Sequence, residues 1–278
     1  MLKHARDAFR DAGVIAREWE PLNFSAPPDL SRAVAEYDAF AAVLRDHGAD
    51  VELLPRSDDV SMDSIYVRDA SIVCDRGVVL CRMGKALRGT EPRAQAAWFQ
   101  AAGLPVLGTI QPPGSIEGGD VVWLAPRTLA VGRGYRTNDE GIRQLRALLG
   151  DAIDELVVVP LPHWRGHGDV FHLMSIISPV ADDLAVVYSP LLSVPFRERL
   201  LELGLSLVEV PDEEFDSMGA NVLAIAPRLC VMVAGNPRTR ARLEHAGAHV
   251  IDYDGREISV KGGGGPTCLT RPLLREGP

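Results

Sequence analysis

One cysteine of this chain stands in a setting that suits a nucleophile. Cys268 follows four consecutive glycines, at 262–265, and a Pro-Thr pair. Such a run lets the backbone approach a ligand and exposes amide donors where side chains would obstruct. A thiol reacts through its thiolate, which a nearby cation or imidazole stabilises. The alternative interpretation is a flexible tail that ends in a buried thiol.

Three histidines close together are candidate partners for that thiol. His163, His167 and His172 lie in the stretch PHWRGHGDVFHLMS, and Asp169 stands between the last two. A metal site would need four suitable ligands, but a spacing of five places the rings of His167 and His172 on different faces of a helix or strand. We therefore expect no metal. For His172 taken alone, a histidine satisfied by backbone groups in the core is the competing interpretation.

Carboxylates come directly before two apolar stretches. Glu117 and Asp120 flank a glycine pair, and Asp63 and Asp69 lie six residues apart, which would place them on one face of a strand. Carboxylates that face a pocket match a planar cation with several N–H groups, because paired hydrogen bonds form between them. A plain surface turn explains the glycine pair equally well.

The elements that would position these residues repeat along the chain. Two short apolar runs around a turn predict a hairpin from Ser71, a helix is predicted over 92–103, and LPVLG predicts a further strand. The same order of strand, strand, helix and strand recurs from Asp120, His172 and Asn221. A fifth hairpin is predicted from Cys268, and its missing helix and strand are predicted over 30–48 and 49–55.

Joining that last hairpin to the N-terminal helix and strand would close a ring of five units. We expect a single domain over 1–278, although an open α/β sheet with units that are alike by chance fits the pattern too. In a ring, equivalent positions point at one axis, so residues at the onset of each first strand would converge. We expect a shared pocket, with Asp120 and Asn221 as substrate contacts. The five residues in this phase are Asp69, Asp120, His172, Asn221 and Cys268.

The overall charge narrows the class of ligand. The formal net charge of the 278 residues is -9, which disfavours binding to a nucleic-acid backbone or an anionic membrane surface. No run approaches 18 apolar residues, and the first residues lack the apolar core of a secretory signal, so we expect a cytoplasmic protein. The expected ligand is a small molecule, and the oligomeric state is left open, a homo-oligomer included.

Five motifs in order resemble the guanidino-group-modifying enzymes with the five-bladed α/β-propeller (pentein) fold. This superfamily includes dimethylarginine dimethylaminohydrolases, arginine deiminases and amidinotransferases. The resemblance implies a pseudo-fivefold propeller of ββαβ units closed by the N- and C-terminal segments. The matching motifs are DSIYVRDASIVC at 63–74, EGGDVVWL at 117–124, VGRGYRTN at 131–138, HLMSIIS at 172–178 and GGGGPTCLT at 262–270.

The resemblance also implies roles for the matching residues. Cys268 would attack the guanidinium carbon, and His172 would protonate the departing nitrogen and then activate water. The intermediate would be a covalent thiouronium, so no cofactor is expected. Glu117 and Asp69 would hold the guanidinium nitrogens, with Glu117 also near the imidazole. Further implied contacts are a supporting carboxylate at Asp63, clamps for the amino-acid end at Arg88 and Arg136, and an entrance segment with Leu22 and Asn23.

One departure bears on the reaction. Arginine deiminases and amidinotransferases usually carry His-x-Asp at the catalytic histidine, whereas the third residue here is Met174. The pattern at 63–74 looks closest to the dimethylarginine enzymes, which lack that aspartate too. An alternative alignment of His167 and Asp169 restores His-x-Asp but shifts the phase by five.

The leading hypothesis is hydrolysis of arginine or a methylated arginine to citrulline and an amine or ammonia. An amidinotransferase, an ornithine-forming dihydrolase and a non-catalytic guanidine-binding protein are the alternatives.

Overall fold

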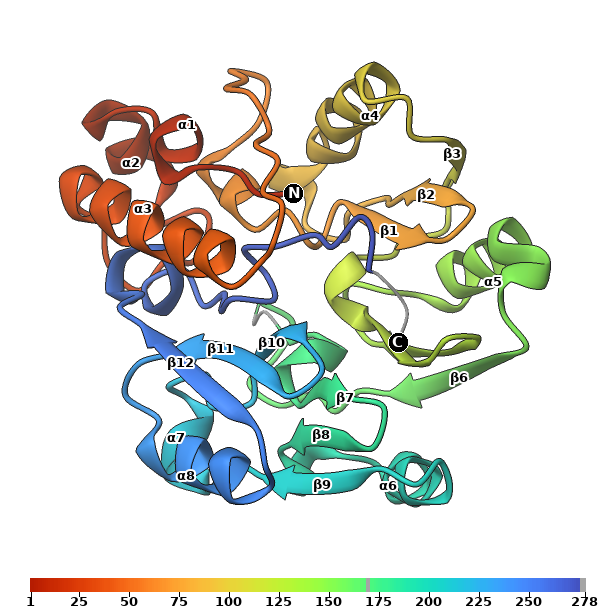
Figure 1. The fold of residues 1–278 in the computed structure, drawn as a ribbon. Coiled ribbons are helices and arrows are strands. Elements are labelled where there is room, and N and C mark those ends of the chain that lie inside the picture. Colours follow the sequence, from red (N-terminus) through yellow and green to blue (C-terminus); the bar gives the residue numbers. More distant parts are fainter. Residues whose placement is uncertain (169–170, 276–278) are drawn as a thin grey trace.

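Four small sheets lie around a common centre, and their helices lie on the outside (Figure 1). The computed structural model describes residues 1–168 and 171–275. In each sheet the first two strands form an antiparallel hairpin, and the third strand pairs in parallel with the second after a helix. The predicted order of strand, strand, helix and strand is therefore confirmed, and the single open sheet is wrong.

The four units have the following bounds. The first comprises β1 (Ser71–Cys74), β2 (Gly77–Leu80), α4 (Glu91–Ala101) and β3 (Val106–Thr109), and the second β4 (Val121–Ala125), β5 (Thr128–Arg133), α5 (Asp139–Leu149) and β6 (Glu155–Pro160). The third comprises β7 (Ile177–Ala181), β8 (Leu184–Val187), α6 (Val194–Glu202) and β9 (Ser206–Glu209), and the fourth β10 (Leu223–Ala226), β11 (Leu229–Val233), α8 (Pro237–His245) and β12 (His249–Tyr253). A short helix that the sequence did not predict, α7 (Asp212–Phe215), follows β9.

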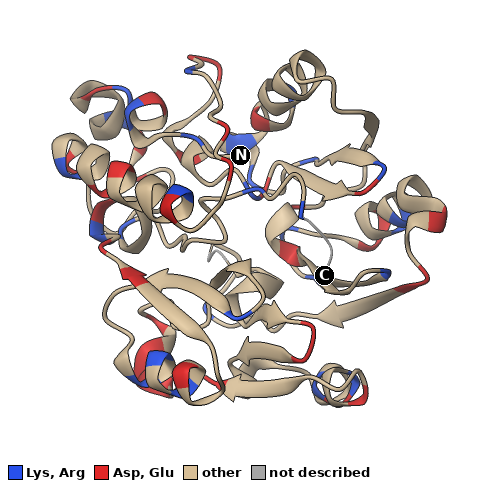
Figure 2. Ribbon diagram, viewed as in Figure 1, with Lys and Arg blue, Asp and Glu red and all other residues tan. Residues whose placement is uncertain are grey.

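How deeply a strand is buried depends on its position within its sheet. The middle strands β2 and β8 are buried along their whole length, whereas the outer strands β3 and β6 are mostly half-buried or exposed. Continuous apolar runs suit the middle strands because both of their faces are covered. Charged side chains gather on the helices and leave most of the strands uncharged (Figure 2). Within the described residues, no helix combines the length and the hydropathy that a membrane span requires.

The fifth position of the ring is built differently from the other four. The helices α1 (Ala5–Phe9), α2 (Ala12–Glu18) and α3 (Leu30–Asp46) occupy it, which agrees with the predicted helix over 30–48 (Figure 1). The predicted strand over 49–55 is reduced to one parallel bridge between Leu2 and Leu53. Met1 and Arg271 exchange two backbone hydrogen bonds, of 2.9 and 3.0 Å. The two ends of the chain thus meet, as the closed ring requires, although the four sheets stay separate.

The predicted hairpin from Cys268 is wrong. Residues 266–269 form a turn in which the Cys268 N–H donates to the Gly265 carbonyl at 3.0 Å, and no strand follows in the described residues. Pro266 and Pro272 lack N–H groups and cannot contribute to a strand ladder, which explains why the turn is not extended into a hairpin.

The glycines before Cys268 are required by close packing. A Cβ atom at Gly262 or Gly264 would collide with the ring of Tyr66, and one at Gly265 would collide with the side chain of Asn221. The tyrosine itself is fixed by a 3.2 Å hydrogen bond from its hydroxyl to the Ile258 carbonyl. The run therefore brings backbone against two side chains of other units, as its composition predicts.

Candidate active site

Turns from all parts of the ring deliver polar side chains to one pocket. Of the five residues that the sequence places at the onset of a first strand, four line this pocket. Three of the carboxylates and basic residues named from the family resemblance lie at its wall beside them. The expected lining residues found there are Asp69, His172, Asn221, Cys268, Asp63, Arg88 and Arg136.

The fifth residue of the phase, Asp120, lies behind the pocket wall. It is completely buried, and its oxygens accept hydrogen bonds from the Thr137 hydroxyl at 2.6 Å and from the Leu173 N–H at 3.0 Å. Burial raises the pKa of Asp120 to about 6, although the nearby His172 opposes this shift. Asp120, which we expected to contact substrate, instead holds the turn after His172 through the Leu173 N–H. Asp120 ends a short 3-10 turn over Gly118–Asp120, and the sequence does not reveal in which direction a side chain points from such a turn.

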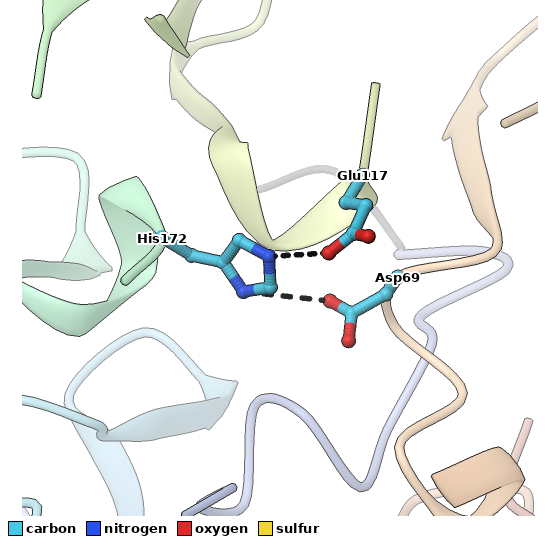
Figure 3. A group of neighbouring side chains, drawn as sticks. All are labelled: Asp69, Glu117 and His172. Atoms are coloured by element: carbon cyan, nitrogen blue, oxygen red, sulfur yellow. Dashed lines mark hydrogen bonds and ion pairs between the residues drawn. The ribbon is translucent and has the colours of Figure 1, made fainter. Parts of the chain in front are cut away.

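The imidazole of His172 is held between two carboxylates from other units (Figure 3). Its Nε2 atom lies 2.7 Å from Glu117 Oε2, and its Nδ1 atom lies 3.8 Å from Asp69 Oδ1. The residue begins a 3-10 turn over Leu173–Ser175, so the strand predicted from Leu173 starts only at Ile177. This turn directs the ring toward the pocket instead of into a sheet.

The charges around His172 set its protonation state. Burial disfavours the imidazolium, but Asp69, Asp120 and Glu117 outweigh that effect and raise the pKa of His172 to about 9. Burial likewise opposes the charge on Glu117, yet His172 and Arg136 hold the pKa of this carboxyl well below its usual range. At neutral pH the pair is therefore an ion pair, with a proton available on the imidazole.

Asp69 has one oxygen that no described group satisfies. Its Oδ2 accepts a 2.6 Å hydrogen bond from Arg88 Nη1, whereas the buried Oδ1 accepts none from residues 1–168 or 171–275. Buried polar atoms nearly always have a partner, so an unpaired carboxylate oxygen facing a pocket indicates a missing donor. An N–H group of a ligand would supply that donor.

The thiol of Cys268 is held by the unit that precedes it. Asn221 donates from Nδ2 to the sulfur at 3.5 Å, and its Oδ1 accepts from the Thr267 N–H at 3.0 Å and the Thr267 hydroxyl at 2.9 Å. Burial and the negative charge of Asp69 raise the pKa of Cys268, while these hydrogen bonds and Arg68 oppose the rise. The thiol is therefore neutral at neutral pH.

Arg88 and Arg136, the two arginines expected to bind the amino-acid end of a substrate, differ in how many of their N–H donors already have a protein partner. Arg88 donates from Nε and Nη2 to Glu91, both at 2.8 Å, in addition to its bond to Asp69. Among the described residues, Arg136 has one side-chain hydrogen bond, of 3.4 Å, from Nη1 to Glu117 Oε1. Of the two guanidinium groups, that of Arg136 thus keeps the larger number of donors for a ligand.

A lysine that the sequence interpretation missed joins the segment of Leu22 and Asn23 to the pocket. Lys85 Nζ lies 2.6 Å from Asp63 Oδ2 and 2.7 Å from the Leu22 carbonyl. The backbone N–H of Lys85 also donates to Glu117 Oε1 at 2.9 Å. Asn23 donates from Nδ2 to the Gly168 carbonyl at 3.4 Å. Lys85 follows β2 outside the quoted motifs, and no periodicity or spacing marks it.

The other two histidines lie away from the pocket lining. Tyr135 binds His163 through a 2.5 Å hydrogen bond and packs against the ring of His167, with centroids 4.7 Å apart. Asp169, the partner of His167 in the alternative alignment, lies outside the described residues. Donor atoms of Asp69, Glu117 and His172 all lie within 4.8 Å of one another. These three groups combine two acidic side chains with one imidazole around a common point.

Comparison with known proteins places this arrangement in context. The sequence matches the family described as N,N dimethylarginine dimethylhydrolase, eukaryotic, over residues 21–275. It is 30% identical to a dimethylarginine dimethylaminohydrolase of Streptomyces coelicolor over 242 residues, which cover 87% of this chain and 86% of that protein. It is 32% identical to an arginine deiminase of Mycobacterium tuberculosis over 193 residues, which cover 58% of this chain and 47% of that protein.

Solved structures show the same likeness. A mutant of the dimethylarginine dimethylaminohydrolase of Pseudomonas aeruginosa, in complex with citrulline, superposes with a TM-score of 0.76 at 26% identity. The match covers 92% of this chain and 95% of that one. The N-terminal domain of a cyanobacterial arginine dihydrolase, bound to its product, has a TM-score of 0.79 at 20% identity over 99% and 98% of the chains. The second match shows a shared fold.

We expect Glu117→Gln to lower the pKa of His172 from about 9 toward the ordinary value of 6.5, because the imidazolium loses its strongest hydrogen-bonded anion. The ion pair also contributes stability that is present below pH 6.5 and lost as the pH rises through 9. An NMR titration of the His172 ring protons measures the midpoint in both proteins. An unchanged midpoint in the variant would show that the Glu117 charge does not hold the proton.

Proposed function

This chain belongs to the N,N-dimethylarginine dimethylhydrolase family, and we propose that it hydrolyses the guanidinium group of a methylated arginine or of arginine itself. The observation that carries this proposal is the constellation around one pocket. It combines the thiol of Cys268, the imidazolium of His172 and the unpaired Oδ1 of Asp69. The family match over residues 21–275 and the relatives named for dimethylarginine support the choice of substrate class.

Binding of the guanidinium would prepare the nucleophile. The cation would donate an N–H group to Asp69 Oδ1, the acceptor that no described residue satisfies. Its charge would also neutralise Asp69, which is one of the two causes of the raised thiol pKa. The Cys268 proton would then leave to solvent, and the thiolate would form only with substrate in place. Arg136, with its unused donors, would bind an anionic tail.

The first half of the reaction would form a covalent intermediate. The thiolate adds to the guanidinium carbon, and the C–N bond to the leaving amine breaks as His172 donates its proton to that nitrogen. The carbon is left as a thiouronium, which still carries one positive charge. Glu117 stabilises the imidazolium beforehand and orients its ring through Nε2.

The second half would release the product. Neutral His172 takes a proton from water, and the water oxygen adds to the thiouronium carbon. The C–S bond then breaks, the thiolate departs, and the released amine takes up the remaining hydroxyl proton. The product is a neutral ureido compound, which is citrulline when the substrate is an arginine. Water is the only co-reactant, so no cofactor is needed.

We expect the purified protein to form citrulline from dimethylarginine, monomethylarginine or arginine. Cys268→Ser keeps the size of the side chain but supplies a far weaker nucleophile, so its rate should fall by at least about 10³-fold. Colorimetric citrulline detection, with mass analysis for ornithine, measures both proteins. Ureido product from none of the three substrates would refute the proposal. Product that forms only with added glycine would indicate an amidinotransferase, and ornithine a dihydrolase.

The two neighbouring histidines allow a matched comparison of the acid/base role. His172→Ala should lower kcat by about 10²–10⁴-fold, because no other group can protonate the leaving amine. His167→Ala, which removes an imidazole outside the pocket lining, should stay close to the wild-type rate. Steady-state kinetics on the best substrate measure both variants. A large loss in the second variant with a normal rate in the first would assign the role to His167 instead.

A further inference from the structure

Arg68 ties down the turn that carries the sulfur. Its Nε atom donates to the Thr267 carbonyl at 2.7 Å, and its Nη2 atom donates to the Thr270 hydroxyl at 3.3 Å. Its backbone N–H donates to the Cys268 carbonyl at 3.2 Å. One residue thus contacts the backbone at Cys268 and the residues on both sides of it. Any displacement of Arg68 would move the nucleophile.

The guanidinium of Arg68 is buried without an ion-pair partner among the described residues, and the charge of Asp69 acts on it only from beyond contact distance. The residue is only 7% exposed, and no carboxylate oxygen of the described chain lies within the 4.0 Å of an ion pair. Its side-chain partners are a carbonyl and a hydroxyl, both neutral. Arg271, also buried, donates to the Arg68 carbonyl and adds positive charge to the region. Burial and Arg271 together lower the pKa of Arg68.

This arrangement contrasts with the other buried arginine near the pocket. Arg88 is 4% exposed and is paired with both Glu91 and Asp69. A buried charge is costly unless an opposite charge compensates it, and Arg88 follows that rule. Among the described residues, Arg68 and Arg271 both lack a carboxylate partner, and of these two it is Arg68 whose charge favours the Cys268 thiolate. An anion that exists only during the reaction would account for both facts.

The groups that face the sulfur favour the same assignment. Asp69 is the negative charge that opposes a thiolate, and Asn221 and Thr267 supply neutral hydrogen bonds. Arg68 is the cation that favours the thiolate. Other titratable groups near the sulfur are the hydroxyls of Tyr66 and Tyr253, which burial keeps neutral, and the imidazolium of His172 across the pocket. The same pocket is also lined by the charged groups of Asp63, Lys85, Arg88 and Arg136.

We propose that Arg68 is a positioning residue for Cys268, which fixes the turn of the nucleophile and is the buried countercharge of its thiolate. The inference rests on the proposed function, because it takes Cys268 as the nucleophile. It adds an interaction within the protein that favours the thiolate, beside the effect of the substrate cation. Two substitutions separate the effect of the Arg68 charge from that of its hydrogen bonds. Arg68→Lys keeps the positive charge, whereas Arg68→Gln keeps a hydrogen-bond donor without the charge.

The test is alkylation of Cys268 by iodoacetamide without substrate, followed against pH by mass spectrometry of the Cys268 peptide. In Arg68→Gln we expect the midpoint of the profile to rise by about one pH unit or more, so that the rate below the midpoint falls about tenfold. Arg68→Lys should stay within about threefold of wild type. Arg10→Gln is the matched control, because it removes a largely buried guanidinium whose partners are Glu18 and Asp58. Its profile should not move.

Near-ultraviolet circular dichroism at each pH identifies the folded variants. A folded Arg68→Gln protein with the wild-type profile would overturn the proposal, even if its citrulline formation is lost, because the residue would then act by structure alone. If Arg68→Gln does not fold, Arg68→Lys decides, and a folded lysine variant whose midpoint rises by a unit would contradict the role of the charge. Alkylation needs no turnover, so a failure of the proposed function appears separately, as absent citrulline from a wild-type protein with a normal profile.

Discussion

The site depends on the buried ion pair between His172 and Glu117, which joins two units of the ring. Both side chains are almost completely buried, and the 2.7 Å contact places a proton on the imidazole at neutral pH. Asp69 Oδ1 lies 3.8 Å from the other ring nitrogen but accepts no hydrogen bond from the described residues. One buried acceptor at the pocket is therefore left without a hydrogen-bond donor. A planar cation is the kind of ligand that such an acceptor and a neighbouring thiol would bind.

The ring of similar units explains how residues so distant in sequence meet. Each first strand is preceded by a turn, and these turns lie at the inner side of their sheets. Asp69, Glu117, His172 and Asn221 are carried by the turns of four successive units, and Cys268 by the turn at the fifth position. The meeting of Met1 with Arg271 fixes that fifth position, so closure of the ring also places the nucleophile.

The periodicity of the chain was sufficient to predict the four units and the phase that leads to the pocket. The periodicity wrongly predicted a strand at Cys268, where the chain forms a turn. Two prolines and a close-packed glycine run prevent the backbone hydrogen bonds of a strand pair there. The periodicity also could not reveal side-chain direction, which is why Asp120, in the same phase as His172, lies behind the wall. The partners of Arg88 and the position of Lys85 depend on contacts between loops, and spacing along the chain carries no information about them.

The central claim is that Cys268 forms a covalent bond to the guanidinium carbon, and acid quenching of the reaction during turnover tests it most directly. Mass spectrometry of the Cys268 peptide should show the mass of the substrate less its leaving amine. The same adduct should arise from dimethylarginine, monomethylarginine and arginine, as far as each is turned over, because only the leaving amine differs. Turnover with an unmodified Cys268 peptide at every quench time, or an adduct on another residue, would contradict the account.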